Sequence, residues 1–102
     1  MGIYKYLFNS GNQQDILKYC NNKLRPLEEY DHANGTCLQE TLVEYSMNGF
    51  SHMKTAEKLY IHRNSLQHRL EKIEELLGFE LNDYAEYLEL LNCILVKRFM
   101  FM

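Results

Sequence analysis

The sequence has few residues that interrupt a helix and few that could staple a fold. It holds one proline, five glycines, no tryptophan and three cysteines among 102 residues. Cys20, Cys37 and Cys93 form no CxxC or Cys/His spacing, which argues against a disulfide framework or a zinc site. We therefore expect buried or half-buried thiols in a reducing compartment. No apolar run reaches the roughly 18 residues of a membrane span, and no leader pattern opens the chain, so we expect a cytoplasmic location.

An excess of positive charge is also missing. The formal net charge is −3, from 11 basic and 14 acidic residues, which at first argues against a nucleic-acid partner. The charges are unevenly distributed, because residues 50–72 hold two acids, Glu57 and Glu71, against five bases. The local charge there is +3, and the rest of the chain has −6. The five basic residues are Lys54, Lys58, Arg63, Arg69 and Lys72. This distribution predicts a basic patch on an acidic body.

The sequence also has no alternation of apolar and polar residues long enough for a strand. Its apolar residues recur at helical spacing. The length suits one core. The predicted fold class is all-α, a compact helical domain of five or six helices. We expect a helix after Asn12 that ends near Arg25, because the residue before a proline disfavours helical geometry. Pro26 then opens a short turn through Tyr30.

The middle of the chain predicts three further helices. Thr36 to Gln39 has the form of a capping box before a helix over 37–48 that buries Leu38, Leu42 and Tyr45. Asn48-Gly49 ends that helix. Ser51 caps a short helix with Met53, Ala56 and Leu59 on its inner face. A break at Tyr60-Ile61 precedes a helix over about 63–77, which Gly78 ends in the left-handed conformation. Its buried stripe is Leu66, Leu70, Ile73 and Leu77.

Residues 51–77 therefore have the layout of a helix-turn-helix, in which the second helix enters the major groove, and residues 52–73 loosely resemble the Fis-type helix-turn-helix proteins. With the apolar stripe inside, polar side chains on the first turns point outward, where amides and imidazoles can read bases. The predicted base-reading residues are Asn64, Ser65, Gln67 and His68. The five basic residues of the patch are predicted to contact phosphates. Two alternatives stay open: Arg63 can pair with an acidic residue of the domain, and His62 can cap the helix without touching DNA.

The sequence from LQETL through TAEKL, IHRNSLQHRLEKIEELLG and LND closely resembles the C-terminal helix-turn-helix domain of the PucR family of bacterial transcription regulators. The resemblance covers roughly residues 15–99 and implies DNA binding by the 62–77 helix. It also implies a longer regulator, whose upstream sensory domain is absent from this chain. The matched signature positions are His62, Arg63, Asn64, Ser65, Arg69 and Leu70. One departure is Tyr60, at a turn position where many helix-turn-helix proteins have glycine, which predicts strain or a looser turn.

The last predicted helix, opened by the capping pair Asp83 and Glu86, continues toward Phe99 and has two apolar stripes. We expect the stripe through Tyr84, Leu88, Leu91, Leu95 and Phe99 to cover the core. The second stripe has two readings, either a surface covered by the N-terminal helices or a homodimer interface. Its residues are Tyr87, Leu90, Ile94 and Phe101. The alternative function is accordingly a protein-interaction or dimerisation module that uses this helix.

The chain is predicted to consist of an N-terminal helical lead-in segment over 1–35, followed by the helix-turn-helix DNA-binding domain with its C-terminal helix over 36–102. No enzyme is expected, because the sequence has no glycine-rich phosphate loop and no nucleophile elbow. Neither HExxH nor a pair of histidines four residues apart is present, so no metal or cofactor is predicted.

Overall fold

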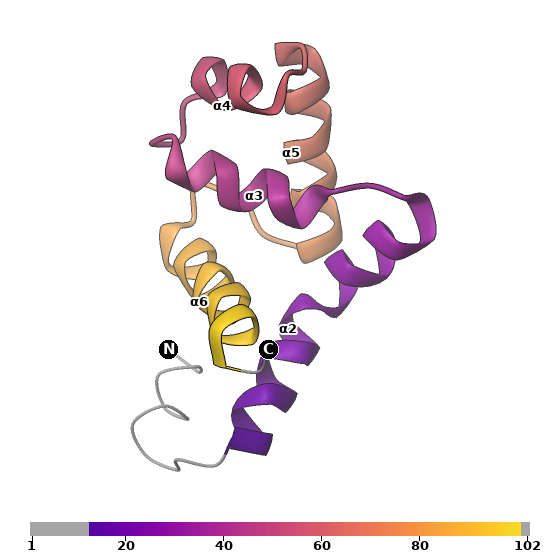
Figure 1. The fold of residues 1–102 in the computed structure, drawn as a ribbon, viewed down its shortest axis with the longest axis vertical. Helices are drawn as coiled ribbons and strands as arrows, with labels where there is room; N and C mark the ends of the chain where they lie inside the picture. Colours follow the sequence, from indigo (N-terminus) through magenta and orange to yellow (C-terminus); the bar gives the residue numbers. More distant parts are fainter. Residues whose placement is uncertain (1–12, 101–102) are drawn as a thin grey trace. The chain divides into compact units, whose positions relative to one another are not determined.

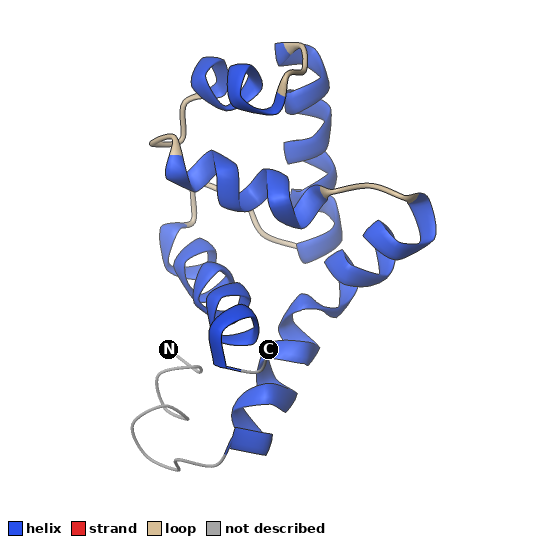
Figure 2. Ribbon diagram, viewed as in Figure 1, coloured by secondary structure: helices blue, strands red, loops and turns tan. Residues whose placement is uncertain are grey.

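The computed structural model describes residues 13–100, which form five helices and no strand (Figures 1 and 2). This confirms the predicted all-α class. The helices are α2 (Gln13–Asn34), α3 (Leu38–Met47), α4 (His52–Leu59), α5 (Arg63–Leu77) and α6 (Tyr84–Met100). Within that range, none of the helices combines the length and the apolar character that crossing a bilayer requires.

Contacts divide the described residues into two units, each with its own internal packing. One unit holds residues 13–25 of α2 together with residues 81–100, and the other runs from Pro26 to Glu80. The helix-turn-helix lies wholly inside the second unit. In this division α6 groups with the first half of α2, while the predicted boundary after residue 35 stays a prediction.

The predicted helix end at Arg25 is wrong, since α2 continues through Pro26 to Asn34. A proline inside a helix removes one backbone hydrogen bond and clashes with the preceding turn, at a cost of about 3 kcal/mol. Leu24 and Leu27 on either side of it are both fully buried. Burying two leucine side chains contributes about 1.5–3 kcal/mol each, which is enough to offset that cost.

The second unit is built on three helices, α3, α4 and α5, that all contact one another. The predicted stripe of α5 is its buried face: Leu66 and Ile73 are fully buried and Leu70 nearly so. Gly78 ends α5 with a φ of 78°, as predicted. The core of the three helices consists of Leu38, Leu42, Ala56, Leu66, Leu70 and Ile73.

The start of α3 is capped from outside, so the predicted capping box is wrong. Cys37 occupies the cap position and its side chain makes no capping hydrogen bond. Instead the Asp31 carboxylate, near the end of α2, accepts from the backbone N–H of Leu38 at 2.8 Å and of Gln39 at 3.1 Å. The Thr36 hydroxyl donates to the same carboxylate at 2.6 Å. One aspartate thus satisfies two orphan donors of α3 and ties the end of α2 to it.

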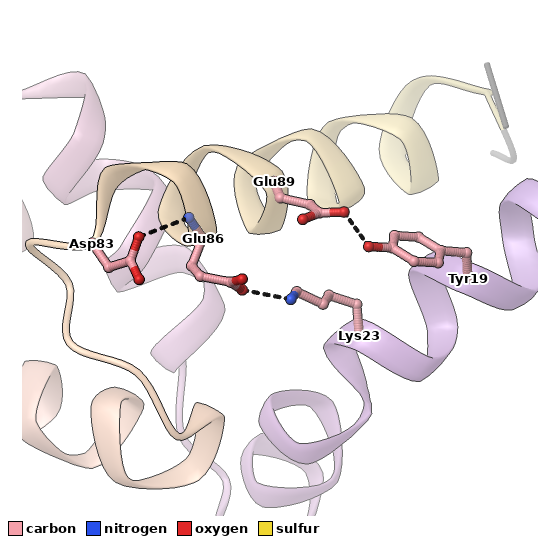
Figure 3. A network of polar contacts seen from close by, with 5 residues as sticks. All are labelled: Tyr19, Lys23, Asp83, Glu86 and Glu89. Atoms are coloured by element: carbon pink, nitrogen blue, oxygen red, sulfur yellow. Dashed lines mark hydrogen bonds and ion pairs between the residues drawn. The ribbon is translucent and has the colours of Figure 1, made fainter. Parts of the chain in front are cut away.

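In the first unit, two polar contacts join α2 to α6 (Figure 3). Lys23 Nζ lies 2.8 Å from Glu86 Oε2, and the Tyr19 hydroxyl donates to Glu89. The Asp83 side chain accepts from the backbone N–H of Glu86 at 3.4 Å, so Asp83 caps α6 as predicted, while the Glu86 carboxylate turns to α2.

On α6 the second stripe is buried, as one of its two readings expected, while the stripe that was expected to cover the core is largely exposed. Tyr87, Leu90 and Ile94, the proposed dimer residues, are at most 1% exposed and so belong to the chain's own core. Phe101 lies outside the described residues. The exposed side chains are those of the other stripe: Tyr84 at 62%, Leu88 at 48%, Leu95 at 44% and Phe99 at 73%.

The three cysteines also differ in burial. Cys20 of α2 and Cys93 of α6 are fully buried, as expected, whereas Cys37 is exposed. The hydrogen bond that the Cys93 thiol donates to Cys20, together with burial, raises the pKa of Cys93. Both buried thiols therefore lie next to each other within the first unit.

Candidate nucleic-acid interface

The turn between α4 and α5 sets how the second helix is presented. Ser51 caps α4, and its hydroxyl accepts from the Lys54 backbone N–H at 3.2 Å. Tyr60 ends α4 in the left-handed conformation with φ 57°, which glycine adopts at lower cost. Its side chain is 94% exposed and packs on little. The departure from glycine noted in the sequence therefore corresponds to a strained residue at this turn.

His62 begins α5 as its cap. Its Nδ1 accepts from the Asn64 backbone N–H at 3.0 Å, so Nδ1 has no proton and the ring proton is on Nε2. This is the capping role that the sequence left open for His62. On α4, Ala56 is buried as predicted, but Met53 is 58% exposed and Thr55 takes the inner position. Met53 was wrongly placed because three residues in two turns do not fix the rotation of a short helix.

The four predicted base-reading residues, Asn64, Ser65, Gln67 and His68, are all exposed on the first two turns of α5. They lie opposite or beside the buried stripe of Leu66, Leu70 and Ile73, as a period of 3.6 residues requires. Amides, a hydroxyl and an imidazole thus form one polar face. That face can exchange hydrogen bonds with the edges of bases.

Gln67 is held on both sides of its amide. Its Oε1 lies 3.1 Å from His52 Nε2, at the start of α4, and its Nε2 donates to Glu71 Oε1 at 3.0 Å. The His52 ring in turn meets the Tyr45 ring of α3 edge to face, with centroids 5.4 Å apart. His52 has no predicted role in base reading or phosphate contact. No spacing rule could have found it, because fifteen residues and a turn separate it from Gln67.

The five cations of the patch fall into two groups. Lys54, Lys58 and Arg63 are exposed, and their side chains make no hydrogen bond or ion pair with other residues between 13 and 100. Arg69 donates to the Thr41 hydroxyl of α3 at 3.2 Å. Lys72 Nζ lies 3.3 Å from Glu75 Oε1 and 5.0 Å from the centre of the Tyr30 ring. The second group is therefore engaged by the chain itself.

The two groups lie on different flanks of α5. Arg63 and Gln67 are four residues apart and share the flank that meets α4 through His52. Arg69 and Lys72 are three residues apart on the flank that meets α3 and the end of α2. Arg63 thus lies on the flank of α5 that faces α4, the helix to which Lys54 and Lys58 belong. Thr41 and Tyr30, which hold Arg69 and Lys72, carry no signal in the sequence pattern.

Across the described part of the chain, no cluster of three or more histidine, cysteine, aspartate or glutamate side chains could hold a metal ion. The chemistry of the face is hydrogen bonding and charge. It has exposed amide, imidazole and ammonium groups, which complement the base edges and phosphates of a duplex.

Comparison with known proteins identifies the fold of this site. The model of the PucR C-terminal helix-turn-helix domain matches residues 38–95. The proline-responsive transcriptional activator PutR of Bacillus subtilis is 33% identical over 96% of this chain and 24% of its own length. The purine catabolism regulatory protein of the same organism is 40% identical over 69% of this chain and 13% of its own length.

The carbohydrate diacid regulator of Escherichia coli is 34% identical over 54% of this chain and 14% of its own length. The chain therefore spans about a quarter or less of these relatives. No solved structure matches it.

Proposed function

The chain belongs to the family of PucR C-terminal helix-turn-helix domains, a family of DNA-binding transcription regulators, and on that premise we propose that it binds DNA sequence-specifically by docking α5 in the major groove. The observation that supports this is the exposed polar face of α5 next to exposed cations. The regulator of which it is a part would be several times longer, as its relatives are, and would hold a sensory domain upstream. Its location would be cytoplasmic.

Base reading falls to the first two turns of α5. Asn64 and Gln67 can pair bidentately with adenine, and His68 and Ser65 can exchange single hydrogen bonds with other bases. All four side chains are exposed, so no repacking precedes contact.

Phosphate contact falls to Lys54, Lys58 and Arg63, because their side chains are exposed and unengaged within residues 13–100. Arg69 and Lys72 are already bonded to Thr41 and Glu75, so they hold the fold more than they offer charge. Releasing counterions from phosphates makes binding depend steeply on salt, with roughly one unit of slope for each neutralised phosphate.

The test is selection of bound duplexes from a random pool, followed by titrations at several salt concentrations. Lys58→Ala should weaken all duplexes alike and lower the salt slope by about one. Lys18→Ala, an exposed lysine of the first unit, is the matched control and should change neither. Gln67→Ala should relax preference at one base position, by a discrimination of about 1–3 kcal/mol. Equal losses for Lys58→Ala and Gln67→Ala on selected and scrambled duplexes would contradict these roles.

A second candidate function is self-association through α6. Four large apolar side chains, Tyr84, Leu88, Leu95 and Phe99, are 44–73% exposed along one face. Contiguous exposed apolar patches mark interaction sites. The spacing is symmetrical: in an antiparallel pair of α6 helices, Tyr84 of one copy faces Phe99 of the other, and Leu88 faces Leu95.

Charge supports a second copy of this chain as the occupant. Asp83 precedes α6 and Arg98 lies in its last turn. The antiparallel pairing brings the acidic start of each helix beside the basic end of the other. A two-fold axis of this kind matches two half-sites on DNA.

Sedimentation across a range of concentrations tests this pairing. The parent chain should shift from monomer to dimer, and Leu88→Lys should abolish the shift. Met47→Lys is the control, since Met47 is 75% exposed on α3 and lies outside the proposed contact. A parent chain that stays monomeric at high concentration, leaving the face to a different partner, overturns the proposal.

A further inference from the structure

A hydrogen-bonded chain of three side chains crosses the polar face of the helix-turn-helix. His52 Nε2 and Gln67 Oε1 lie 3.1 Å apart, and Gln67 Nε2 donates to Glu71 Oε1 at 3.0 Å. An amide oxygen only accepts, so the His52 nitrogen must have the proton and donate it. The contacts therefore restrain the Gln67 amide at both its oxygen and its nitrogen.

His52 is itself held in place by aromatic rings. Tyr45 of α3 meets the imidazole edge to face at 5.4 Å and meets Phe50 in the same geometry at 5.6 Å. Ser51, directly before His52, caps α4. The imidazole thus packs on the Tyr45 ring, which Phe50 contacts in turn, and from there it reaches Gln67 of α5.

Two hydrogen bonds leave the Gln67 amide half used. The amide has two lone pairs on oxygen and two hydrogens on nitrogen, and His52 and Glu71 take one of each. One acceptor and one donor remain. Adenine presents the matching pair in the major groove, a donor at N6 and an acceptor at N7.

We propose that His52 is a positioning residue for base reading, which holds the Gln67 amide in the orientation that pairs with a base. This inference rests on the proposed DNA-binding function and adds a residue that need not touch DNA. Glutamine loses much rotamer freedom when it is fixed, and a restraint present before binding removes that loss from the binding step. The expected gain in affinity for the preferred base is about tenfold at most.

Glu71 has a separate effect that the test can isolate. Its carboxylate restrains Gln67 but also places a negative charge on the face that meets phosphates. Glu71→Gln keeps an acceptor for the Gln67 amide and removes the charge. It should therefore tighten binding to all duplexes while leaving the preference at the Gln67 base unchanged.

Two substitutions of His52 separate its hydrogen bond from its ring packing. His52→Phe keeps a ring against Tyr45 and loses the donor, and His52→Gln keeps a donor near the Nε2 position and loses the ring. Discrimination is measured with duplexes that differ only at the base whose preference Gln67→Ala relaxes. His52→Phe should lose several-fold discrimination at that position alone, and His52→Gln should recover part of it.

The double variant His52→Phe/Gln67→Ala should discriminate no worse than Gln67→Ala, because His52 has no amide to position once Gln67 is alanine. Thermal unfolding of each variant checks that the domain is folded. A parent chain that selects no sequence overturns the proposed function together with this inference. A parent that selects a sequence, with His52→Phe reading it equally well or losing affinity uniformly over all bases, overturns only the positioning role.

Discussion

The helices α5 and α6 are of similar length and both bury an apolar stripe, yet their outer faces are opposite in character. α5 exposes Asn64, Gln67 and His68. α6 exposes Tyr84, Leu88, Leu95 and Phe99 and buries Glu89, which is only 7% exposed. A surface helix ordinarily places polar groups outward. The outer face of α5 fits a hydrated polyanion, and that of α6 fits a second apolar surface.

The polar contacts of the two interiors also differ. The three-helix core of the second unit includes only the hydroxyls of Thr41 and Thr55 as polar groups, whereas in the first unit Lys23 pairs with Glu86 and Tyr19 with Glu89 (Figure 3). Partly buried polar pairs fix partner and register more than they stabilise. Both units therefore gain stability from buried apolar side chains, and the polar pairs of the first unit also hold α2 and α6 in register.

The largest expected effect comes from removing a buried leucine of α5. Leu66→Ala should lower the free energy of unfolding by about 2–5 kcal/mol, because the side chain is fully buried. Leu88→Ala on α6 should change it by less than about 0.5 kcal/mol, since Leu88 is 48% exposed. Urea titrations of both variants measure the contrast. A large loss for Leu88→Ala would mean that the outer face of α6 is covered within the chain.

A smaller effect is expected from the cap that Asp31 provides to α3. Asp31→Ala should cost about 1–2 kcal/mol, because the backbone N–H groups of Leu38 and Gln39 lose their acceptor. Asp31→Asn keeps one acceptor and should cost less. Both free energies come from denaturant titration, with Thr36→Ala as the control for the hydroxyl contact. A cost for Asp31→Asn equal to that of Asp31→Ala would show that charge, not the cap, matters.

Tyr60 offers a substitution that should stabilise the second unit. Its φ of 57° favours glycine, and its 94% exposed side chain loses little packing when removed. Tyr60→Gly should raise the free energy of unfolding by about 0.5–1 kcal/mol, as calorimetry would measure. Tyr60→Ala keeps the strain and should not stabilise. Equal gains from both variants would show that removal of the tyrosine ring, and not relief of backbone strain, causes the stabilisation.

The smallest effect is a pH dependence confined to the first unit. Burial, reinforced by the hydrogen bond to Glu89, raises the pKa of Tyr19 above its ordinary value near 10. The folded state therefore favours the neutral phenol, so the stability that Tyr19 contributes is intact below about pH 10 and is lost as the pH rises above it. The stability difference between the parent and Tyr19→Phe, measured from pH 8 to 11, should shrink above pH 10. A constant difference would contradict the raised pKa.

Much of the second unit was predictable because its information is local. The Leu66–Leu70–Ile73 stripe, the Ser51 cap and the Gly78 terminator all follow from spacing within one helix, and each is confirmed. The exposed polar face of α5 follows from the same stripe. The family resemblance is confirmed over residues 38–95.

Two of the wrong predictions share a cause, because each depended on what an element packs against outside its own helix. Asp31 replaced the predicted capping box of α3, and the burial of Leu24 and Leu27 let α2 continue through Pro26. The contacts of Arg69 with Thr41 and of Lys72 with Tyr30 were likewise not predictable from the sequence, while the phosphate role of these two cations stays a prediction. The spacing of apolar residues along the sequence does not show which residues of other helices lie beside a given side chain.

The sequence by itself determined that this chain is helical, that residues 51–77 form a helix-turn-helix, and which face of α5 is polar. Periodicity and caps act over a few residues, so they can be read without a fold. Only the tertiary structure decided which apolar stripe of α6 lies inside, and that His52 meets Gln67. Two apolar stripes on one helix are equivalent until another element covers one, and side chains on different helices meet only when the turn between them is built.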